Sequence, residues 1–243
     1  MVVCEVATGK IRALVSRPDY KLSALDKAIE NTAEPLLNRA LCNYNIGSVF
    51  KPLVAGVGCE QGKTLTVDCK GYTNIDGLNF TCHNLGGHGL MNIKDAIKFS
   101  CNSYFYNFVQ LLDVNGLLST AKIAGMESGV ILAPNLVAAK GSFGSIARRE
   151  PTKRELANLS IGQGELLLSP ITITNLYMAV ANGGSYRMPS LIEGEVTDGK
   201  LTSKTPLPAE VRLFSQNTAA RLKEYLAAVL EEDGTGKKAN PTL

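Results

Sequence analysis

The clearest structural signal in the sequence is a strongly apolar helix, predicted over residues 169–182. Ser169 is a favourable N-cap residue, and Pro170 suits the first helical position because the N–H that proline lacks has no partner there. Gly183 and Gly184 end the segment, as glycine ends many helices. The spacing of the apolar side chains predicts one inner face, formed by Ile173, Leu176, Tyr177 and Val180.

Other segments predict a strand pair at the start of the chain and several more helices. Residues 1–16 carry β-branched and apolar residues on both sides of Thr8-Gly9, where glycine allows a tight turn. Helices are expected over 48–60, over 92–112 with a break near Ser100, over 114–124 and over 215–231, the last with an apolar face of Leu222, Leu226 and Val229. Less regular structure is expected over 20–47, 64–91 and 126–168.

Composition narrows the class of protein. With 243 residues, 45% of them apolar and 19% charged, the chain is typical of a globular protein of one large or two small domains. Its net charge is +3, with 25 basic and 22 acidic residues mixed along the sequence, so nucleic acid is not an expected partner. No apolar run reaches the ~18 residues of a membrane helix, and no signal peptide is recognisable. Either the protein is cytoplasmic or an export segment lies upstream.

The six cysteines lack the close C-x-x-C pair of a metal knuckle. Cys69 and Cys82 flank a glycine-rich stretch and could form a disulfide in an exported protein, although buried free thiols are the simpler interpretation. His83 and His88 could join them in a metal site, but the spacing fits no common zinc pattern. The expectation is therefore a structural loop, with no metal and no cofactor.

Ser48-Val49-Phe50-Lys51 is the first candidate for chemistry. A serine hydroxyl is a poor nucleophile until a base removes its proton, and a lysine three residues later on a helix can reach that hydroxyl. Lys51 could act as the base only if burial or a nearby cation lowers its pKa. The same spacing occurs in Ser119-Thr120-Ala121-Lys122, which we interpret as exposed helix surface because nothing around it suggests a site.

Ser100-Cys101-Asn102 is the second candidate, at the predicted helix break. There a hydroxyl and an amide could both point into a cleft, relay a proton and hold a substrate amide. Taken alone, the tripeptide is more simply explained as a turn or cap. A similar tripeptide, Ser215-Gln216-Asn217, is best explained as a helix cap.

Together these segments resemble the penicillin-binding protein transpeptidase family. Asn45-Ile46-Gly47-Ser48-Val49-Phe50-Lys51-Pro52 resembles the first active-site motif of that family, and Lys98-Phe99-Ser100-Cys101-Asn102-Ser103-Tyr104-Phe105 resembles the second at the expected distance. The opening residues resemble the strand pair that precedes the active site. Residues 159–184, with Ser160-Ile161-Gly162-Gln163-Gly164 and Ala181-Asn182-Gly183-Gly184, resemble a stretch between the second and third motifs, and Gly87-His88-Gly89 resembles a turn of the family.

The resemblance implies an α/β (α+β) fold of the transpeptidase type, here a mainly helical portion with the N-terminal strand pair of an antiparallel sheet. It also implies a peptidoglycan transpeptidase in which Ser48 attacks stem peptides ending in D-alanyl-D-alanine and is acylated by β-lactams. Lys51 would be the base, Ser100 would pass a proton, Asn102 would hold the substrate amide, and the Ser48 backbone N–H would form half of the oxyanion hole. Such an enzyme works on the outer face of the bacterial cytoplasmic membrane, with an anchor expected upstream and cell-wall synthesis proteins as possible partners.

One departure from the family is clear, because the third motif, Lys-Thr/Ser-Gly on a strand, is absent. Lys63-Thr64-Leu65 and Lys204-Thr205-Pro206 lack the glycine, and Thr235-Gly236-Lys237-Lys238 resembles only the segment before that motif. Residues 1–243 are therefore expected to form a single partial domain without the remaining central strands, weakly active and poorly stable alone. Equal fluorescent-penicillin labelling of this chain and of a version extended through the third motif would refute that expectation.

Two other functions stay open at this level. A β-lactamase or β-lactam sensor of the same superfamily is one, although Glu155-Leu156-Ala157-Asn158 matches only partly the Glu-x-x-Leu-Asn pattern of a class A β-lactamase. A catalytically silent scaffold that keeps the fold for partner binding is the other. Residues 57–64 nearly match a phosphate-binding loop but lack its first glycine, which argues against nucleotide binding.

Overall fold

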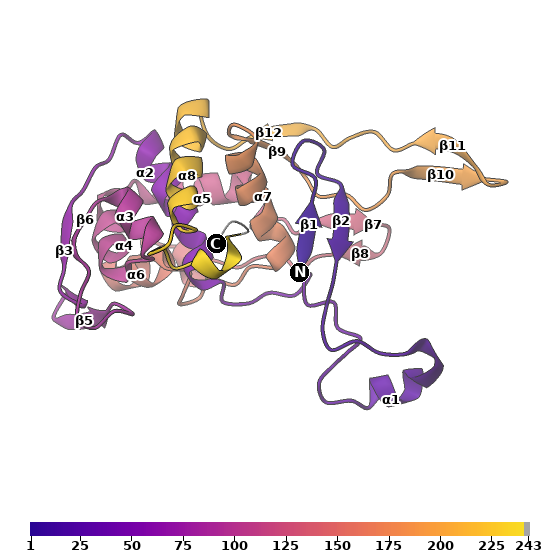
Figure 1. Cartoon of the computed structure of the whole chain (residues 1–243), viewed down its shortest axis with the longest axis horizontal. Helices are drawn as coiled ribbons and strands as arrows, with labels where there is room; N and C mark the ends of the chain where they lie inside the picture. Colours follow the sequence, from indigo (N-terminus) through magenta and orange to yellow (C-terminus); the bar gives the residue numbers. More distant parts are fainter. Residues whose placement is uncertain (241–243) are drawn as a thin grey trace.

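The computed structural model describes residues 1–240 and consists of a helical body with a strand pair at its side (Figure 1). Two segments project from this body in Figure 1: the arm that carries α1 and the hairpin β10–β11. The helices are α1 (Leu25–Ile29), α2 (Lys51–Glu60), α3 (Ile93–Lys98), α4 (Asn102–Phe108), α5 (Val114–Ile123), α6 (Lys153–Ser160), α7 (Pro170–Ala181) and α8 (Gln216–Ala228).

The strands of the described chain form antiparallel pairs. These pairs are β1 (Val2–Cys4) with β2 (Ile11–Leu14), β3 (Val67–Cys69) with β6 (Gly89–Met91), β4 (Tyr72–Ile75) with β5 (Leu78–Thr81), β7 (Ile131–Ala133) with β8 (Leu136–Val137), β9 (Ser185–Arg187) with β12 (Glu210–Arg212), and β10 (Gly194–Thr197) with β11 (Lys200–Lys204). No helix of the described residues is long and apolar enough to cross a membrane.

Helix α2 packs against α3, α4, α5 and α8 and is buried from Lys51 to Gly58. Two glycines on it allow aromatic rings to approach the helix closely. A Cβ at Gly56 would lie 2.6 Å from the ring of Phe214, and one at Gly58 would lie 2.3 Å from the ring of Phe108. The turn that precedes α2 is therefore continuous with a closely packed helix. Such a helix can hold a reactive side chain of the turn in a fixed position.

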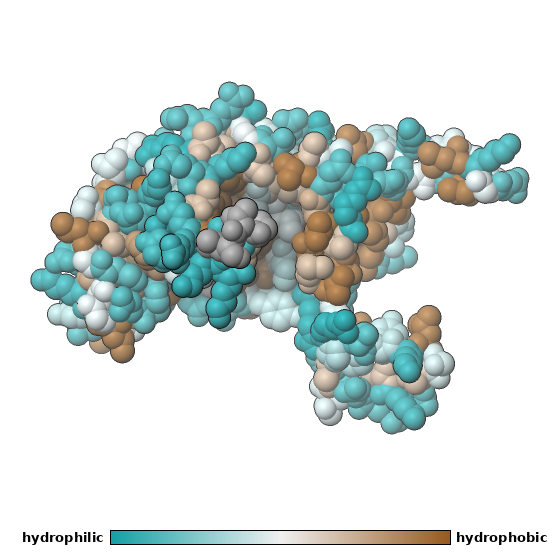
Figure 2. All heavy atoms as spheres, viewed as in Figure 1, coloured by the Kyte–Doolittle hydropathy of each residue, from teal (hydrophilic) through white to brown (hydrophobic). Residues whose placement is uncertain are grey.

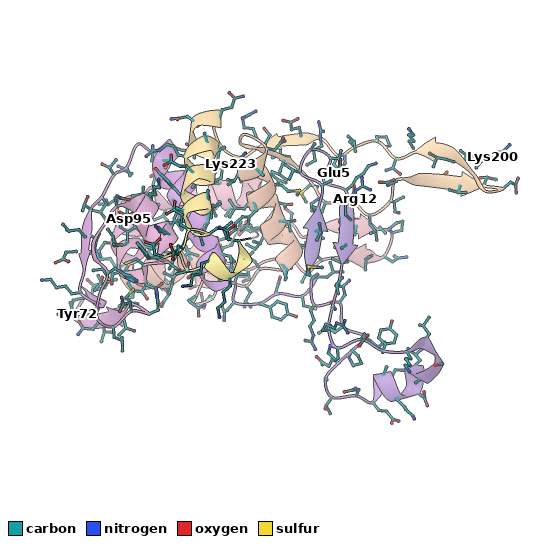
Figure 3. The ribbon with its side chains drawn as sticks, in the orientation of Figure 1. Glu5, Arg12, Tyr72, Asp95, Lys200 and Lys223 are labelled. Atoms are coloured by element: carbon teal, nitrogen blue, oxygen red, sulfur yellow. The ribbon has the colours of Figure 1, made fainter. Side chains whose placement is uncertain are left out.

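The strand pair β1–β2 lies beside α7 (Figure 1). Val2 pairs with Leu14 and Val3 with Ala13, as the predicted hairpin around Gly9 requires. Apolar surface gathers over this strand pair in Figure 2, where the more exposed apolar side chains are Met1, Val3, Val6 and Val15. Arg12 forms ion pairs with Glu5 and Glu193 at the polar edge of the pair, whereas Lys200 lies at the far tip of the β10–β11 hairpin (Figure 3).

Most sequence-based predictions of elements are confirmed. The strand pair, the capped helix α7, the helices around position 100 and α8 with its Ser215 cap all form. Helix α7 is buried on almost every side rather than on one face, which explains why its sequence is so apolar. On α8 the buried residues are Thr218, Ala219, Leu222, Tyr225 and Ala228, while Leu226 and Val229 are only half-buried.

Two predictions of irregular structure were wrong. Residues 64–91 contain the four short strands β3 to β6, whose length of three or four residues is too small to give a periodic signal. Residues 126–168 contain β7, β8 and the helix α6. Thr152 and Glu155 cap α6 reciprocally, so the Ser/Thr-x-x-Glu signature of a capping box was present in the sequence and could have revealed this helix.

Candidate active site

Ser48 lies in a 3₁₀ turn, η2 (Gly47–Phe50), that runs directly into α2 at Lys51. In 3₁₀ geometry, side chains three residues apart lie above one another, so Ser48 and Lys51 share one side of the turn. Ser48 is exposed, whereas Lys51 is only 2% exposed. The phenolic O–H of Tyr177 on α7 donates a hydrogen bond to the Val49 carbonyl at 3.2 Å and so fastens the turn to the neighbouring helix.

The second candidate segment supplies the hydrogen-bond acceptors for the Lys51 ammonium group. Its Nζ donates to the Ser100 carbonyl oxygen at 2.6 Å, to Ser100 Oγ at 3.0 Å and to Asn102 Oδ1 at 2.7 Å. The ring of Phe105 lies below, with its centroid 5.4 Å from Nζ. Three N–H donors therefore meet three oxygen acceptors, which is what a buried lysine needs.

Burial lowers the pKa of Lys51 from its ordinary value of 10.5 to about 8. Negative charge on the nearby sulfurs of Cys101 and Cys82 acts in the opposite direction and keeps the pKa of Lys51 from falling further. A pKa near 8 means that roughly a tenth of the lysine is neutral at pH 7, so the amine can accept a proton. Lys51 therefore has the lowered pKa that a lysine base requires.

Ser100 occupies an unusual backbone conformation between α3 and α4. Its φ of +52° lies in the left-handed region, which costs a non-glycine residue about 1–3 kcal/mol. The Cys101 N–H holds the turn by donating to the Ala96 carbonyl at 2.9 Å. This turn aims the Ser100 carbonyl, the Ser100 hydroxyl and the Asn102 amide at one point, the Lys51 ammonium.

A cleft of about 210 Å³ opens over these groups. Ser48, Lys51 and Ser100 line it together with side chains that sequence reasoning did not assign to a site. Those additional residues are Val49, Pro52, Ile97, Tyr177, Leu226, Val229 and Thr235. Val49 and Pro52 lie within the first motif, and Thr235 begins the segment that resembles the approach to the third motif. Tyr177, Leu226 and Val229 had only an apolar spacing that indicated core packing, so their place at the site depends on how α7 and α8 pack against α2.

The other segments with similar spacing do not line this cleft. Ser119 is an exposed residue within α5, as predicted, and Ser215 caps α8 by accepting a hydrogen bond from the Thr218 N–H at 3.2 Å. Glu155 caps α6 and accepts a hydrogen bond from Arg149, which lowers the pKa of its carboxyl group to about 2. It does not line the cleft, so it is not placed as a β-lactamase base would be.

Gly162, in the segment 160–164, packs directly against the backbone of Gly47. It has a φ of +72°, and its carbonyl accepts a hydrogen bond from the Gly47 N–H at 3.0 Å. A Cβ at this position would lie 2.0 Å from the Gly47 carbonyl oxygen, immediately before Ser48. The segment therefore forms a backbone support for the turn that carries Ser48, and only glycine fits at position 162.

We expect Gly162→Ala to displace the Ser48 turn and to lower the rate of acylation by a fluorescent penicillin at least ~10-fold, because a small misplacement of a nucleophile is costly. Gly183→Ala is the matched control. Gly183 has a similar φ of +65°, but its Cβ would meet nothing within 4 Å. Equal acylation rates in the two variants would show that the contact with Gly47 does not support the site.

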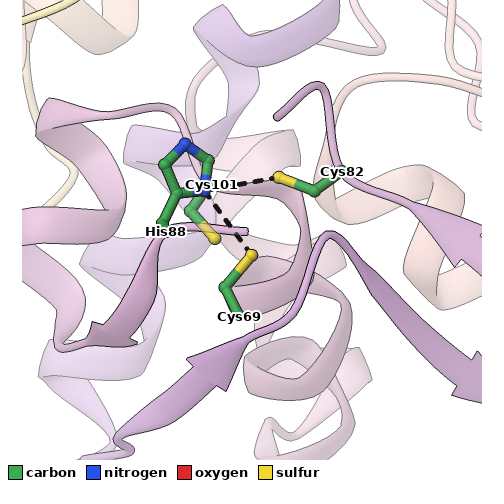
Figure 4. Close-up of side chains that lie close together, drawn as sticks. All are labelled: Cys69, Cys82, His88 and Cys101. Atoms are coloured by element: carbon green, nitrogen blue, oxygen red, sulfur yellow. Dashed lines mark hydrogen bonds between the residues drawn. The ribbon is translucent and has the colours of Figure 1, made fainter. Parts of the chain in front are cut away.

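The cysteines and histidines considered as metal ligands lie directly behind the Ser100 turn. Figure 4 shows that Cys69, Cys82 and His88 meet Cys101, which sequence reasoning did not include because it lies inside the second motif. His83 is exposed and lies outside this set. All six cysteines are free thiols in the structure, and Cys69 and Cys82 are buried, as the simpler interpretation expected.

The family of the chain follows from its similarity to known proteins. The family model for the penicillin binding protein transpeptidase domain matches residues 1–243. The chain belongs to this family. The α/β fold expected from the resemblance is confirmed by solved structures, among them penicillin-binding protein A from Mycobacterium tuberculosis in an imipenem acyl-enzyme complex, with a TM-score of 0.86 and 27% identity over 100% of this chain and 59% of that one.

Curated relatives carry names of the same kind. The chain is 29% identical to the peptidoglycan D,D-transpeptidase PbpA of M. tuberculosis over 93% of its length, and 27% identical to the stage V sporulation protein D of Bacillus subtilis over 95% of its length. It spans 49% of the first protein and 36% of the second, so it corresponds to about half or less of these relatives.

Proposed function

We propose that this member of the transpeptidase family performs the acylation step of a peptidoglycan D,D-transpeptidase and is a β-lactam target. Ser48 Oγ would attack the carbonyl carbon of the penultimate D-alanine of a stem peptide, and the bond to the terminal D-alanine would break. An amine of a neighbouring strand would then take the acyl group and regenerate the serine. The observation that carries this proposal is Lys51, buried with a lowered pKa one turn after an exposed serine.

Ser48, Lys51 and Ser100 line the cleft, whereas Asn102 does not line it and contacts Lys51. Lys51 would receive the Ser48 proton, and Ser100, whose Oγ lies 3.0 Å from Nζ, would pass a proton to the leaving amine. Asn102, with its Oδ1 oriented by Lys51, would hold the substrate amide. The backbone N–H of Ser48 would donate to the developing oxyanion.

The outer face of the bacterial cytoplasmic membrane is the proposed place of action, because peptidoglycan stem peptides are met there. Proteins of cell-wall synthesis are proposed partners. Relatives named peptidoglycan D,D-transpeptidases support both proposals.

A β-lactamase would share the acylation step and differ in the next one. The engagement of Glu155 with Arg149 and Thr152 leaves that carboxylate without access to an acyl-serine in the cleft, which favours the transpeptidase. The lifetime of the penicilloyl-enzyme distinguishes the two: hours for a penicillin target, and far less for a hydrolase.

The proposal is tested by peptide mapping of the full gene product after reaction with a penicillin. We expect one penicilloyl group on the peptide that contains Ser48, and release of D-alanine from a synthetic stem peptide. An adduct on another residue would overturn the assignment. A protein that forms no adduct and releases no D-alanine would be a silent scaffold.

The acylation rate should depend on pH through Lys51. Since the base is the neutral amine, whose pKa is lowered to about 8, the rate constant should rise ~10-fold per unit below pH 8 and level off above it. The measurement is stopped-flow acylation between pH 6 and 9.5. A rate that is flat from pH 6 to 8 would contradict a lysine base in this state.

A further inference from the structure

The side-chain cluster behind the catalytic turn consists of three thiols and one imidazole from separate segments. Cys69 ends β3, Cys82 follows β5, His88 precedes β6, and Cys101 stands at the start of α4. Their sulfur and nitrogen atoms all lie within 4.8 Å of one another. The three cysteines are buried and unoxidised, and His88 is half-buried (Figure 4).

We infer that Cys69, Cys82, His88 and Cys101 bind a structural zinc ion. Thiolates and imidazole are the ligands that zinc prefers, and Cys₃His is an established structural set. With Zn–S bonds of about 2.3 Å and a Zn–N bond of about 2.0–2.1 Å at tetrahedral angles, sulfur and nitrogen ligands lie ~3.5 Å apart and two sulfurs ~3.8 Å apart. The observed distances from His88 Nδ1 to the sulfurs of Cys69 and Cys82 are 3.5 Å and 3.6 Å.

The backbone around the cluster is built to hold these positions. The His88 N–H donates to the Cys69 carbonyl at 2.9 Å, and the Cys82 N–H donates to the Gly71 carbonyl at 2.8 Å. Gly87 has a φ of +83°, and a Cβ there would lie 2.2 Å from the Cys69 carbonyl oxygen. The Asn102 N–H also points at the Cys82 sulfur, 3.3 Å away, as amide groups do around thiolate ligands.

Cys101 links the proposed zinc site to the segment that contacts Lys51. It lies between Ser100 and Asn102, the two residues that hold Lys51. An ion bound to the Cys101 sulfur would therefore connect residues 64–91, which contain β3 to β6, to the strained turn at Ser100. The sequence-based expectation of a metal-free loop failed to include Cys101, whose sulfur completes the ligand set only after folding.

The first test is the zinc content of the full gene product, purified without chelators and measured by plasma mass spectrometry. We expect about one zinc ion per chain, and a decrease of at least ~10-fold in Cys69→Ser and in His88→Gln. The matched controls are Cys59→Ser, a thiol outside the cluster, and His83→Gln, the neighbouring imidazole. Wild-type protein without zinc, or equal loss of zinc in the controls, would overturn the proposal.

A second test uses only the wild-type chain, in case the variants do not fold. Native thiol titration should show the three cluster cysteines protected until a chelator is added, and cobalt substitution should give the absorption of a tetrahedral thiolate site. Chelation should also increase hydrogen exchange at residues 100–103 more than in α7. Unprotected thiols, or a Cys69–Cys82 disulfide in the purified protein, would contradict a zinc site. The penicilloyl adduct on Ser48 is read by mass, so failure of the zinc proposal would leave the proposed function intact.

Discussion

Replacing Ser48 by Ala should abolish acylation by a fluorescent penicillin, with a fall in the second-order rate constant of at least ~10³-fold. The substitution removes the only hydroxyl proposed as nucleophile, and no bond to the acyl group can then form. Ser48 is exposed at the mouth of the cleft, so the loss of one oxygen atom should change the melting temperature little. Acylation is measured by gel fluorescence and by the mass of the intact protein.

The chain contains its own matched control for this experiment. Ser119 stands three residues before Lys122 and so repeats the Ser-x-x-Lys spacing on the exposed surface of α5. Ser119→Ala should be acylated at the wild-type rate. The assignment of the nucleophile would be wrong if Ser48→Ala kept the wild-type rate, whatever the behaviour of the control.

The two candidate active-site segments could be proposed from the sequence because each one carries its chemical groups within a few residues. Ser48 and Lys51 are one turn apart, and Ser100 and Asn102 flank a single residue, so local spacing was sufficient to propose them. What the sequence could not supply was the direct contact between the two segments. That contact depends on the left-handed Ser100 turn and on the burial of Lys51 by surrounding elements.

The cysteine cluster, by contrast, could not be recognised from local spacing in the sequence. Its ligands come from segments up to 32 positions apart, Cys69 to Cys101, and they fit no local metal-binding pattern. Only the folding of the four short strands β3 to β6 brings them together, and strands of three or four residues leave little periodic signal. The helix α6 was missed for a different reason, since its capping box was readable in the sequence.

Replacing Lys51 by Met should lower the acylation rate constant by about 10²–10⁴-fold, the usual contribution of a positioned general base. Methionine fills a similar volume, so the cleft should keep its shape. The Ser100 carbonyl, the Ser100 hydroxyl and Asn102 Oδ1 lose their donor, which costs on the order of 1–3 kcal/mol for each unsatisfied group. The end of ammonium burial offsets part of this cost.

The pH dependence of unfolding isolates the buried ammonium from these other effects. Because the pKa of Lys51 is lowered to about 8 in the folded chain, the unfolded chain binds more protons at this residue between pH 8 and its ordinary value of 10.5. The wild type should therefore gain stability relative to Lys51→Met as pH rises through this window, by up to ~3 kcal/mol, and the full penalty should be present below pH 8.

Urea unfolding of both proteins at pH 7 and pH 10 measures this difference, and Lys122→Met, which replaces an exposed lysine of α5, is the control. A stability difference between wild type and Lys51→Met that stays constant over this range would mean that Lys51 titrates normally. Its amine would then be almost completely protonated at neutral pH, and the proton of Ser48 would need another acceptor. Since burial is what would make this lysine a base, its effects on rate and on stability should appear together or not at all.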